Sequence, residues 1–158
     1  MIQDLSKTTK EYDKANNKLR IAIVKSNFYK DLTDSLEKSC REYLVESGIL
    51  INKIKTFNVP GSWEIPLITK KIAASKKYDG IVTFGVILKG ETYHFEAIAK
   101  ESSRALMDIV LEFNIPVTFE ILAVYDLEQA KKRSIGKYNK GIEAAKTVLE
   151  MIKELSKI

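Results

Sequence analysis

The chain has 158 residues, of which 45% are hydrophobic and 30% are charged, and its formal net charge is +5. These values are typical of a folded globular protein and exclude wholesale disorder, and the longest apolar runs are too short to span a membrane. Lysines often lie beside glutamates, so the charge favours a mixed, solvated surface over a nucleic-acid-binding face.

The N-terminal part of the sequence has no clear period. Residues 1–18 are polar, which predicts a flexible arm and no signal peptide. The only cysteine, Cys40, lies inside a helical pattern and cannot form an internal disulfide, so we expect it to be buried and unreactive. We therefore expect a cytoplasmic protein, and the length predicts one domain over residues 1–158.

From Leu19 onward, β-branched runs alternate with amphipathic segments. In chain order the pattern predicts a strand at 19–25, a helix with Leu32, Leu36, Tyr43 and Leu44 on one side that ends at Gly48, a strand at 51–59, a helix at 63–75 with Pro66 in its first turn, a strand at 80–87, a helix at 91–113, a strand at 117–124, and a helical remainder with a break near Gly136. The run at 80–87 is apolar throughout, as expected of a central parallel strand covered on both faces.

This alternation predicts a doubly wound α/β fold with a four-stranded parallel sheet. Ligands of such sheets bind at the carboxyl ends of the strands. The loops expected there are residues 27–28, 60–62, 88–90 and 124–126. Four strands leave sheet edges and apolar helix surface uncovered, so we also expect self-association.

The third of these loops carries the clearest chemical candidates. Gly90 should allow a tight turn, and Glu91 and Thr92 should open a helix whose free N–H groups could bind a phosphate. Simple capping of the helix by Glu91 or Thr92 is the alternative. His94, the only histidine, is predicted about one turn into this helix, where an imidazole could transfer protons. An ordinary surface or core-edge histidine is the alternative.

Other candidates also have structural alternatives. Glu64 could accept hydrogen bonds from substrate hydroxyls or complement the helix dipole, and the structural alternative for Trp63 is a place in the core. Arg133 could hold a phosphate, although a surface arginine is commoner. Phe28 and Phe119 could enclose a flat ring or belong to the core. One histidine and one cysteine cannot form the usual metal sites. Catalysis by positioning and proton transfer remains.

Five segments, "VPGSWEIP", "GVILKGETYHF", "PVTFEIL", "LEQAKKRS" and "NKGIEAA", together resemble the lumazine synthase family from about Arg20 to the C-terminal helix. The resemblance implies a flavodoxin-like three-layer sandwich whose sheet gains an N-terminal strand from a neighbouring subunit. It implies condensation of 5-amino-6-(D-ribitylamino)uracil with 3,4-dihydroxy-2-butanone 4-phosphate to 6,7-dimethyl-8-ribityllumazine, with release of phosphate and water. This is the penultimate step of riboflavin biosynthesis and needs no cofactor, metal, nucleic acid or membrane.

The resemblance also implies roles for particular residues, with His94 on the proton-transfer histidine. For the pyrimidine substrate, it implies stacking by Phe28, contacts to the ribityl chain and ring edge by Ser62, Trp63 and Glu64, and backbone contacts by Val86, Ile87 and Leu88. For the phosphate, it implies contacts by Glu91, Thr92 and Arg133. It also implies that Phe119 reaches into the neighbouring subunit's site and that Lys140 of the "NKG" turn belongs to the site.

The sequence departs from the family pattern in four places. Tyr29, Ser62 and Glu120 stand where the family usually has asparagine, alanine and glycine, and "AVYD" at 123–126 replaces a threonine-rich turn. A carboxylate at Glu120, near the expected interface, needs a partner or water.

Two alternative functions stay open at this point. One is an archaeal-type riboflavin synthase, whose sequences lack the "GETYHF" pattern, and the other is a non-catalytic flavin- or lumazine-binding shell protein. The resemblance further implies a homo-oligomer with sites at subunit interfaces, either a pentamer or an icosahedral shell of pentamers. The short "SIGKYNKG" connection favours the shell.

Overall fold

The computed structural model describes residues 12–158. In this part of the chain, four parallel strands form one sheet in the order β2-β1-β3-β4. That order matches the first four strands of a flavodoxin-like sheet. The strands are β1 (Ile21–Ser26), β2 (Ile54–Val59), β3 (Gly80–Leu88) and β4 (Val117–Val124), and the α-helices are α1 (Lys30–Glu46), α2 (Ile65–Ser75), α3 (His94–Phe113), α4 (Leu127–Ser134) and α5 (Lys140–Leu155). The predicted α/β fold with a four-stranded parallel sheet is confirmed.

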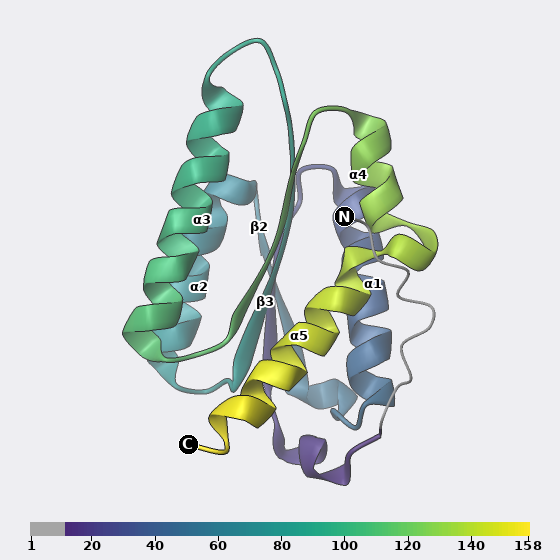
Figure 1. Ribbon diagram of the computed structural model, residues 1–158, viewed down its shortest axis with the longest axis vertical. Helices are drawn as coiled ribbons and strands as arrows, with labels where there is room; N and C mark the ends of the chain where they lie inside the picture. The colour runs from purple at the N-terminus through teal and green to yellow at the C-terminus, as the bar shows by residue number, and fades with distance from the viewer. Residues whose placement is uncertain (1–11) are drawn as a thin grey trace.

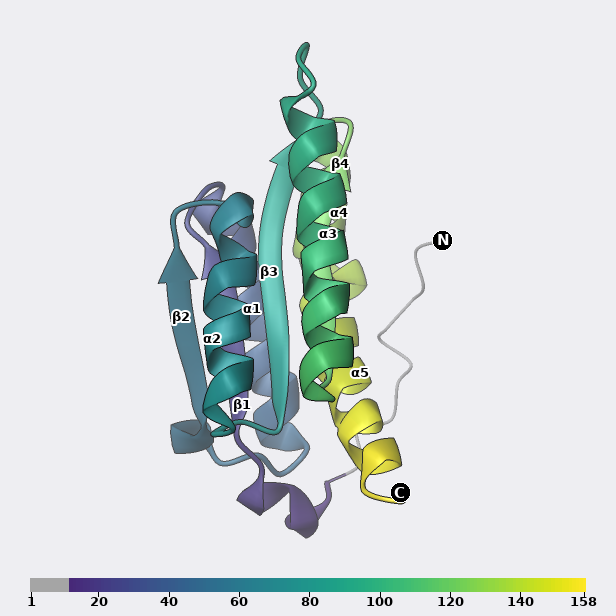
Figure 2. The ribbon, with the colours of Figure 1, turned by 90° about the vertical axis from the view of Figure 1, so that its left-hand side faces the viewer.

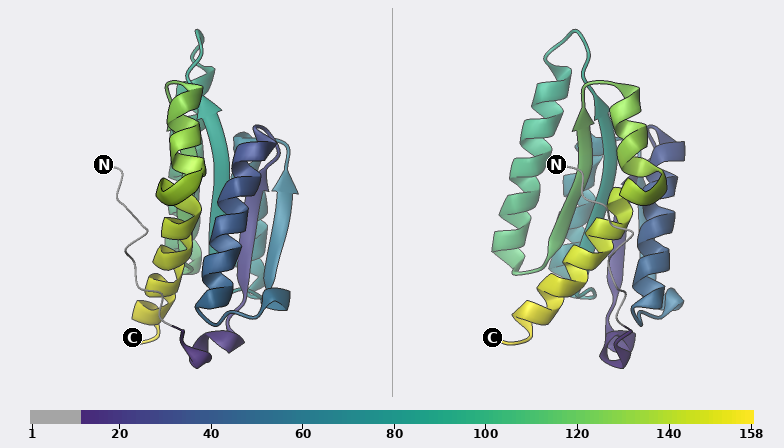
Figure 3. Two further views of the ribbon diagram at one scale, coloured as in Figure 1. Left: turned by 90° about the vertical axis from the view of Figure 1, so that its right-hand side faces the viewer. Right: turned by 45° about the vertical axis from the view of Figure 1, so that its right-hand side comes forward.

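The helices form a layer on each face of the sheet. α2 and α3 cover one face, and α1, α4 and α5 cover the other (Figure 1). A view of the first side has α2 and α3 in front of the strands (Figure 2), and a view of the opposite side has α1 and α5 in front (Figure 3). Each face carries its own apolar core. The sheet is therefore buried on both sides, which explains why β3 is apolar apart from Thr83, whose hydroxyl donates to the carbonyl of Thr118.

The apolar stripe of α1 packs on the sheet as predicted. Leu32, Leu36, Tyr43 and Leu44 are buried on this face, and Cys40 lies among them. Burial raises the pKa of the Cys40 thiol far above its ordinary range, which leaves it in the unreactive thiol form. The expectation that Cys40 is buried is confirmed.

Four elements begin later than the sequence predicted: β1 at Ile21, β2 at Ile54, α2 at Ile65 and α3 at His94. The strand expected from residue 51 begins at Ile54, because Ile51–Lys53 form a 3₁₀ turn. The helix expected from Glu91 begins at His94. The hydroxyl of Thr92 accepts a hydrogen bond from the backbone N–H of His94 (3.4 Å), and such local bonds compete with helical structure. His94 is therefore the first helical residue, and the prediction that it lies one turn inside the helix is wrong.

The described end of the N-terminal arm contacts the turn that follows α1. Lys14–Lys18 form a 3₁₀ helix, and Asp13 N–H and the Asn16 side-chain amide both donate to the carbonyl of Ser47 (3.2 and 2.8 Å). Gly48 has a φ of 109°, and a Cβ there would lie 2.4 Å from the Asp13 carbonyl oxygen. Only glycine suits both this turn and the docked arm. The N-terminal strand that the family resemblance implies would come from residues 10–18 of the arm, which lie partly outside the described residues, and it stays a prediction.

No helix within residues 12–158 combines the length and apolar character that crossing a membrane requires.

Candidate active site

The carboxyl ends of β1, β2 and β3 surround a pocket of about 580 Å³. This volume is in the range of small-molecule sites. The pocket is lined by Phe28, Tyr29, Gly61, Ser62, Trp63, Glu64, Val86, Ile87, Leu88, His94, Ala97 and Ile98. The structure therefore brings together eight of the predicted site residues, from three segments that are far apart in the sequence.

Phe28, at the end of β1, stands at the wall of this pocket. Its side chain is 64% exposed, so the alternative that it belongs to the core is wrong. The backbone N–H of Phe28 donates to the carbonyl of Pro60 (3.1 Å), which ties the first loop to the second. The edge of its ring meets Tyr29 at 5.0 Å between centroids, in a T-shaped arrangement. Phe28 therefore presents an exposed aromatic ring at the wall of the pocket.

Tyr29 is a pocket residue that the sequence reading missed. It was noted only as a departure from the family pattern, yet it lines the pocket beside Phe28. Its φ of 54° is left-handed, a conformation that is uncommon for residues other than glycine. The adjacency to Phe28 was the only signal in the sequence that could have pointed to it.

The loop after β2 supplies three predicted residues. It forms a 3₁₀ turn (Ser62–Glu64) that leads into α2. Trp63 is 57% exposed and lines the pocket, so the alternative that it belongs to the core is wrong. Glu64 reaches back, and its Oε2 accepts the backbone N–H of Gly61 (3.0 Å). The carboxylate therefore holds the turn that presents it to the pocket.

Ser62 is buried beneath this turn, against β3. Within the described residues its hydroxyl has no hydrogen-bond partner. A Cβ at Gly85 would lie 2.4 Å from Ser62 Oγ. The serine that replaces the family's usual alanine thus fits only because residue 85 has no side chain. Its hydroxyl oxygen is covered by neighbouring atoms rather than pointing into open space.

The end of β3 forms the floor of the pocket. Val86 and Ile87 are buried, and Leu88 is partly exposed. Beyond Leu88, the backbone N–H of Lys89 donates to the carbonyl of Val124 (2.9 Å), so β3 and β4 stay paired to their carboxyl ends. The chain then returns at His94, which begins α3 with an exposed side chain that lines the pocket.

The connection between β3 and α3 stands at the top of the molecule, beside the connection from β4 to α4 (Figure 1). Glu91 and Thr92 are exposed there and precede the helix, so the prediction that they open it is wrong. Gly90 has a φ outside the left-handed range, and no atom lies within 4 Å of the place of its missing Cβ. The turn itself therefore does not require glycine, and its backbone faces open space.

Besides Glu91 and Thr92, three predicted residues do not line the pocket. Phe119 is 43% exposed on β4, which is an edge strand of this sheet. Arg133, on α4, is partly buried and donates from Nη1 to the carbonyl of Gln129 (3.1 Å). Lys140, at the start of α5, pairs with Glu143 (2.5 Å). These residues belong to the β4, α4 and α5 part of the molecule.

Glu120, the least expected departure, lies on β4 near that Lys140–Glu143 pair. Burial raises the pKa of Glu120 to about 7, with Lys140 opposing the rise and Glu143 adding to it. In the folded protein the Glu120 carboxyl therefore takes up a proton at a higher pH than a carboxyl with the ordinary pKa of 4.5. The stability that this gives is complete below pH 4.5 and is lost as the pH rises through about 7.

Glu120→Gln is therefore expected to stabilise the protein at alkaline pH, because glutamine carries no charge to bury. The gain should be about 1–2 kcal/mol at pH 8 and should shrink at pH 5.5. Thermal unfolding of both proteins at the two pH values measures it. If the two proteins differ in stability by the same amount at both pH values, the raised pKa of Glu120 is contradicted.

Within residues 12–158, the structure has no group of three histidine, cysteine, aspartate or glutamate residues arranged to hold a metal ion.

Comparisons with known proteins identify a single family. A family model described as 6,7-dimethyl-8-ribityllumazine synthase matches residues 18–156. A relative from Pyrococcus furiosus is 43% identical over 143 residues, which covers 90% of this chain and 89% of the relative. Relatives from Ruthia magnifica (41% identity, 85% of this chain and 84% of the relative) and Protochlamydia amoebophila (41%, 90% and 85%) are also similar. All three relatives carry the name 6,7-dimethyl-8-ribityllumazine synthase.

Proposed function

Since the chain belongs to the 6,7-dimethyl-8-ribityllumazine synthase family and catalyses that family's reaction in riboflavin biosynthesis, we propose that its pocket holds the pyrimidine substrate and that His94 transfers protons there. The observation that carries this proposal is the convergence of eight predicted residues on one pocket. The family assignment removes the riboflavin synthase and non-catalytic alternatives.

The pocket suits a flat, polar ring. We assign the stacking surface to Phe28, whose exposed ring would otherwise cost free energy in contact with water. Backbone groups at the end of β3, from Val86 to Leu88, lie at the floor and would hydrogen-bond the edge of the pyrimidine. The loop with Ser62, Trp63 and Glu64 forms the adjacent wall, and we assign it the ribityl chain, whose hydroxyls can donate to the Glu64 carboxylate.

The chemistry requires proton transfers rather than a protein nucleophile. The 5-amino group of the pyrimidine attacks the ketone carbonyl of the second substrate, and the carbonyl oxygen leaves as water. Loss of a carbon-bound proton then allows phosphate to leave, and the ribityl-bearing nitrogen closes the second ring with loss of another water. The exposed His94 imidazole at the pocket can accept and return these protons, while the pocket holds the reactants together.

We assign the phosphate to the connection between β3 and α3, with help from a neighbouring subunit. Glu91 and Thr92 contribute backbone N–H groups next to Gly90, where an approaching anion would meet no side chain. Arg133, Lys140 and Phe119 lie outside this chain's pocket, on and beside an exposed edge strand. Their separation supports a site shared between subunits, in which one chain's Arg133, Lys140 and Phe119 complete its neighbour's pocket.

Mixed oligomers test this shared site. Chains with His94→Ala and chains with Arg133→Ala would be co-expressed with different tags, and oligomers with both tags would be purified. If the two residues come from adjacent chains in a closed ring, about a quarter of the sites should hold both wild-type residues and regain parent activity. If both residues act within one chain, every site is defective. Activity no higher than that of the single variants would then contradict the proposal.

We propose a homo-oligomer of this chain built from pentamers, and the short connection between α4 and α5 favours a closed shell. Sedimentation velocity of the purified protein separates a pentamer from a shell by mass. An N-terminal strand donated to the neighbour's sheet belongs to the same proposal. We assign the protein to the cytoplasm, where a single unpaired cysteine is ordinary.

A further inference from the structure

A charged side chain is buried near the carboxyl end of β1, three residues before Phe28 of the pocket. Lys25, in β1, is only 4% exposed and points toward α1. Its Nζ contacts the carboxylates of Asp34 and Glu37, the second at 2.8 Å. Burial alone would lower the pKa of Lys25, but these hydrogen bonds outweigh it and raise the pKa above the ordinary value of 10.5. Lys25 therefore stays charged although its side chain is buried.

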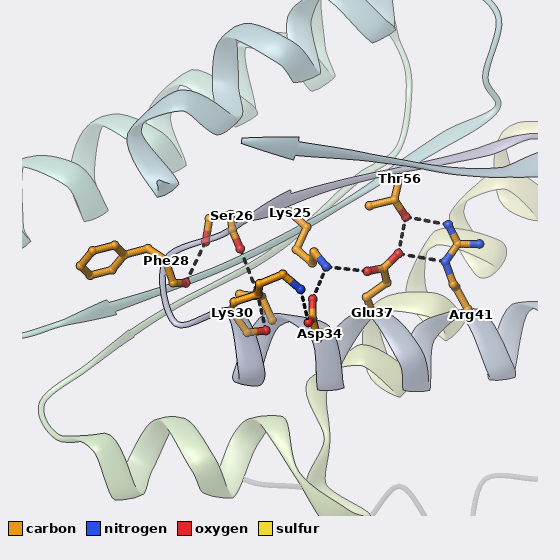
Figure 4. Close-up of polar contacts among 9 residues, drawn as sticks. Lys25, Ser26, Phe28, Lys30, Asp34, Glu37, Arg41 and Thr56 are labelled. Atoms are coloured by element: carbon orange, nitrogen blue, oxygen red, sulfur yellow. Dashed lines mark hydrogen bonds and ion pairs between the residues drawn. The ribbon is translucent and has the colours of Figure 1, made fainter. Parts of the chain in front are cut away.

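The contacts continue away from Lys25 along α1. Glu37 accepts hydrogen bonds from Arg41 (2.9 Å) and from the hydroxyl of Thr56, and Arg41 also donates to Thr56 (2.6 Å) and to the carbonyl of Ile54 (3.3 Å). This far end of the network joins α1 to β2 (Figure 4). It lies away from the pocket and fixes the packing of the helix on the sheet edge.

The near end of the network lies across the last residue of β1 and the connection to α1, which together are residues 26–29. Asp34 contacts Lys25, which precedes the connection, and Lys30, which follows it (2.5 Å). Both contacts lower the pKa of Asp34, that of Lys25 most strongly, so the carboxylate is ionised at neutral pH. Asp34 thus joins the two ends of the connection by ion pairs.

Between the two residues that pair with Asp34, hydrogen bonds lead from α1 to Phe28. The hydroxyl of Thr33 donates to the carbonyl of Ser26 (2.8 Å), and the hydroxyl of Ser26 lies 3.5 Å from the carbonyl of Phe28. The ring of Phe28 points away from the network, beyond the end of β1 (Figure 4). Tyr29 then takes its left-handed conformation, which costs of the order of 1 kcal/mol or more and persists only where surrounding contacts hold it.

We propose that Lys25 and Asp34 are positioning residues for the reaction, because they lock the connection of residues 26–29 so that Phe28 stands at the pocket before the pyrimidine arrives. This inference rests on the proposed stacking role of Phe28. An aromatic ring whose backbone is fixed beforehand loses less conformational entropy when a ligand stacks on it. Without the ion pairs of Asp34 with Lys25 and Lys30, the pyrimidine would have to order the connection as it binds.

The test compares the two ends of the network. Lys25→Met would leave two carboxylates without their cation and could prevent folding, so the near-end variant is Asp34→Asn, which keeps the shape of the side chain. Thr56→Val is the matched control, since it removes a hydrogen-bonding group at the far end. Phe28→Leu is the reference for loss of stacking. For each protein, the KM of each substrate, kcat and the unfolding midpoint are measured.

Asp34→Asn is expected to raise the KM of the pyrimidine substrate about 3- to 10-fold and to leave that of the phosphorylated substrate unchanged. Thr56→Val should lower the unfolding midpoint as Asp34→Asn does, with both KM values at the parent level. The proposal is overturned if Asp34→Asn leaves the pyrimidine KM unchanged, or if Thr56→Val raises it equally. If Phe28→Leu raises that KM while Asp34→Asn does not, the proposed function stands and only the positioning role fails. If Phe28→Leu has no effect, the stacking role itself is wrong.

Discussion

Replacing His94 with alanine should lower kcat by about 10²- to 10⁴-fold, the usual contribution of one general acid–base group, without abolishing turnover. The pocket would still bring the two substrates together, and positioning by itself contributes strongly to the rate. His94 is the only histidine in the sequence, and it is exposed at the pocket where α3 begins. Steady-state formation of the lumazine product, followed by its absorbance, gives kcat for the variant and the parent.

His94→Asn is the matched control for this experiment. Asparagine can still form hydrogen bonds to the substrates, but it cannot accept and return a proton near neutral pH. We expect a loss of kcat similar to that of the alanine variant, with the KM of the pyrimidine substrate close to the parent value. A kcat that stays at the parent level in either variant would remove His94 from the proton-transfer steps.

Replacing Arg133 with alanine should raise the KM of the phosphorylated substrate about 10- to 100-fold, because hydrogen bonds between a guanidinium and a phosphate contribute about 1.5–3 kcal/mol. The contact from Nη1 to the Gln129 carbonyl holds the side chain along α4, so the guanidinium is oriented before the substrate binds. The KM of the pyrimidine substrate should stay at the parent value. Initial rates with each substrate varied in turn measure both constants.

Lys132→Ala serves as the control for charge alone. Lys132 is the exposed neighbour of Arg133 on α4, so its loss removes the same charge from the same region. We expect little change in either KM for this variant. Equal effects of Arg133→Ala on the two substrates, or an equal effect of Lys132→Ala on the phosphorylated one, would contradict a specific phosphate contact by Arg133.

The strands were predicted well where burial fixes the pattern of residues. The run at 80–87 is buried on both faces in β3, and the bounds predicted for β4 agree with the structure. Element starts were less certain, because they depend on single hydrogen bonds. The start of α3 moved to His94, where the hydroxyl of Thr92 accepts the helix's first N–H.

The role of large aromatic residues was harder to judge from their identity. A core position was left open for both Trp63 and Phe28, yet both are more than half exposed at the pocket. An apolar side chain has the same sequence signal in a core and at a ligand site, since both environments exclude water. Tyr29 was missed for a related reason, because a departure from a family pattern does not indicate what the residue contacts.

The sequence alone determined the order of strands and helices along the chain, the apolar face of α1, three of the loops that meet at the pocket and the family to which the chain belongs. These features follow from local periodicity and from residue types at matched spacing, which need no knowledge of distant contacts. Only the tertiary structure decided which candidates meet. It joined His94 with Phe28 and Trp63 in one pocket, left Arg133 and Lys140 outside it, and buried Lys25 between two carboxylates. Such contacts join residues from different elements, and the packing of helices on the sheet sets them rather than any stretch of neighbouring residues.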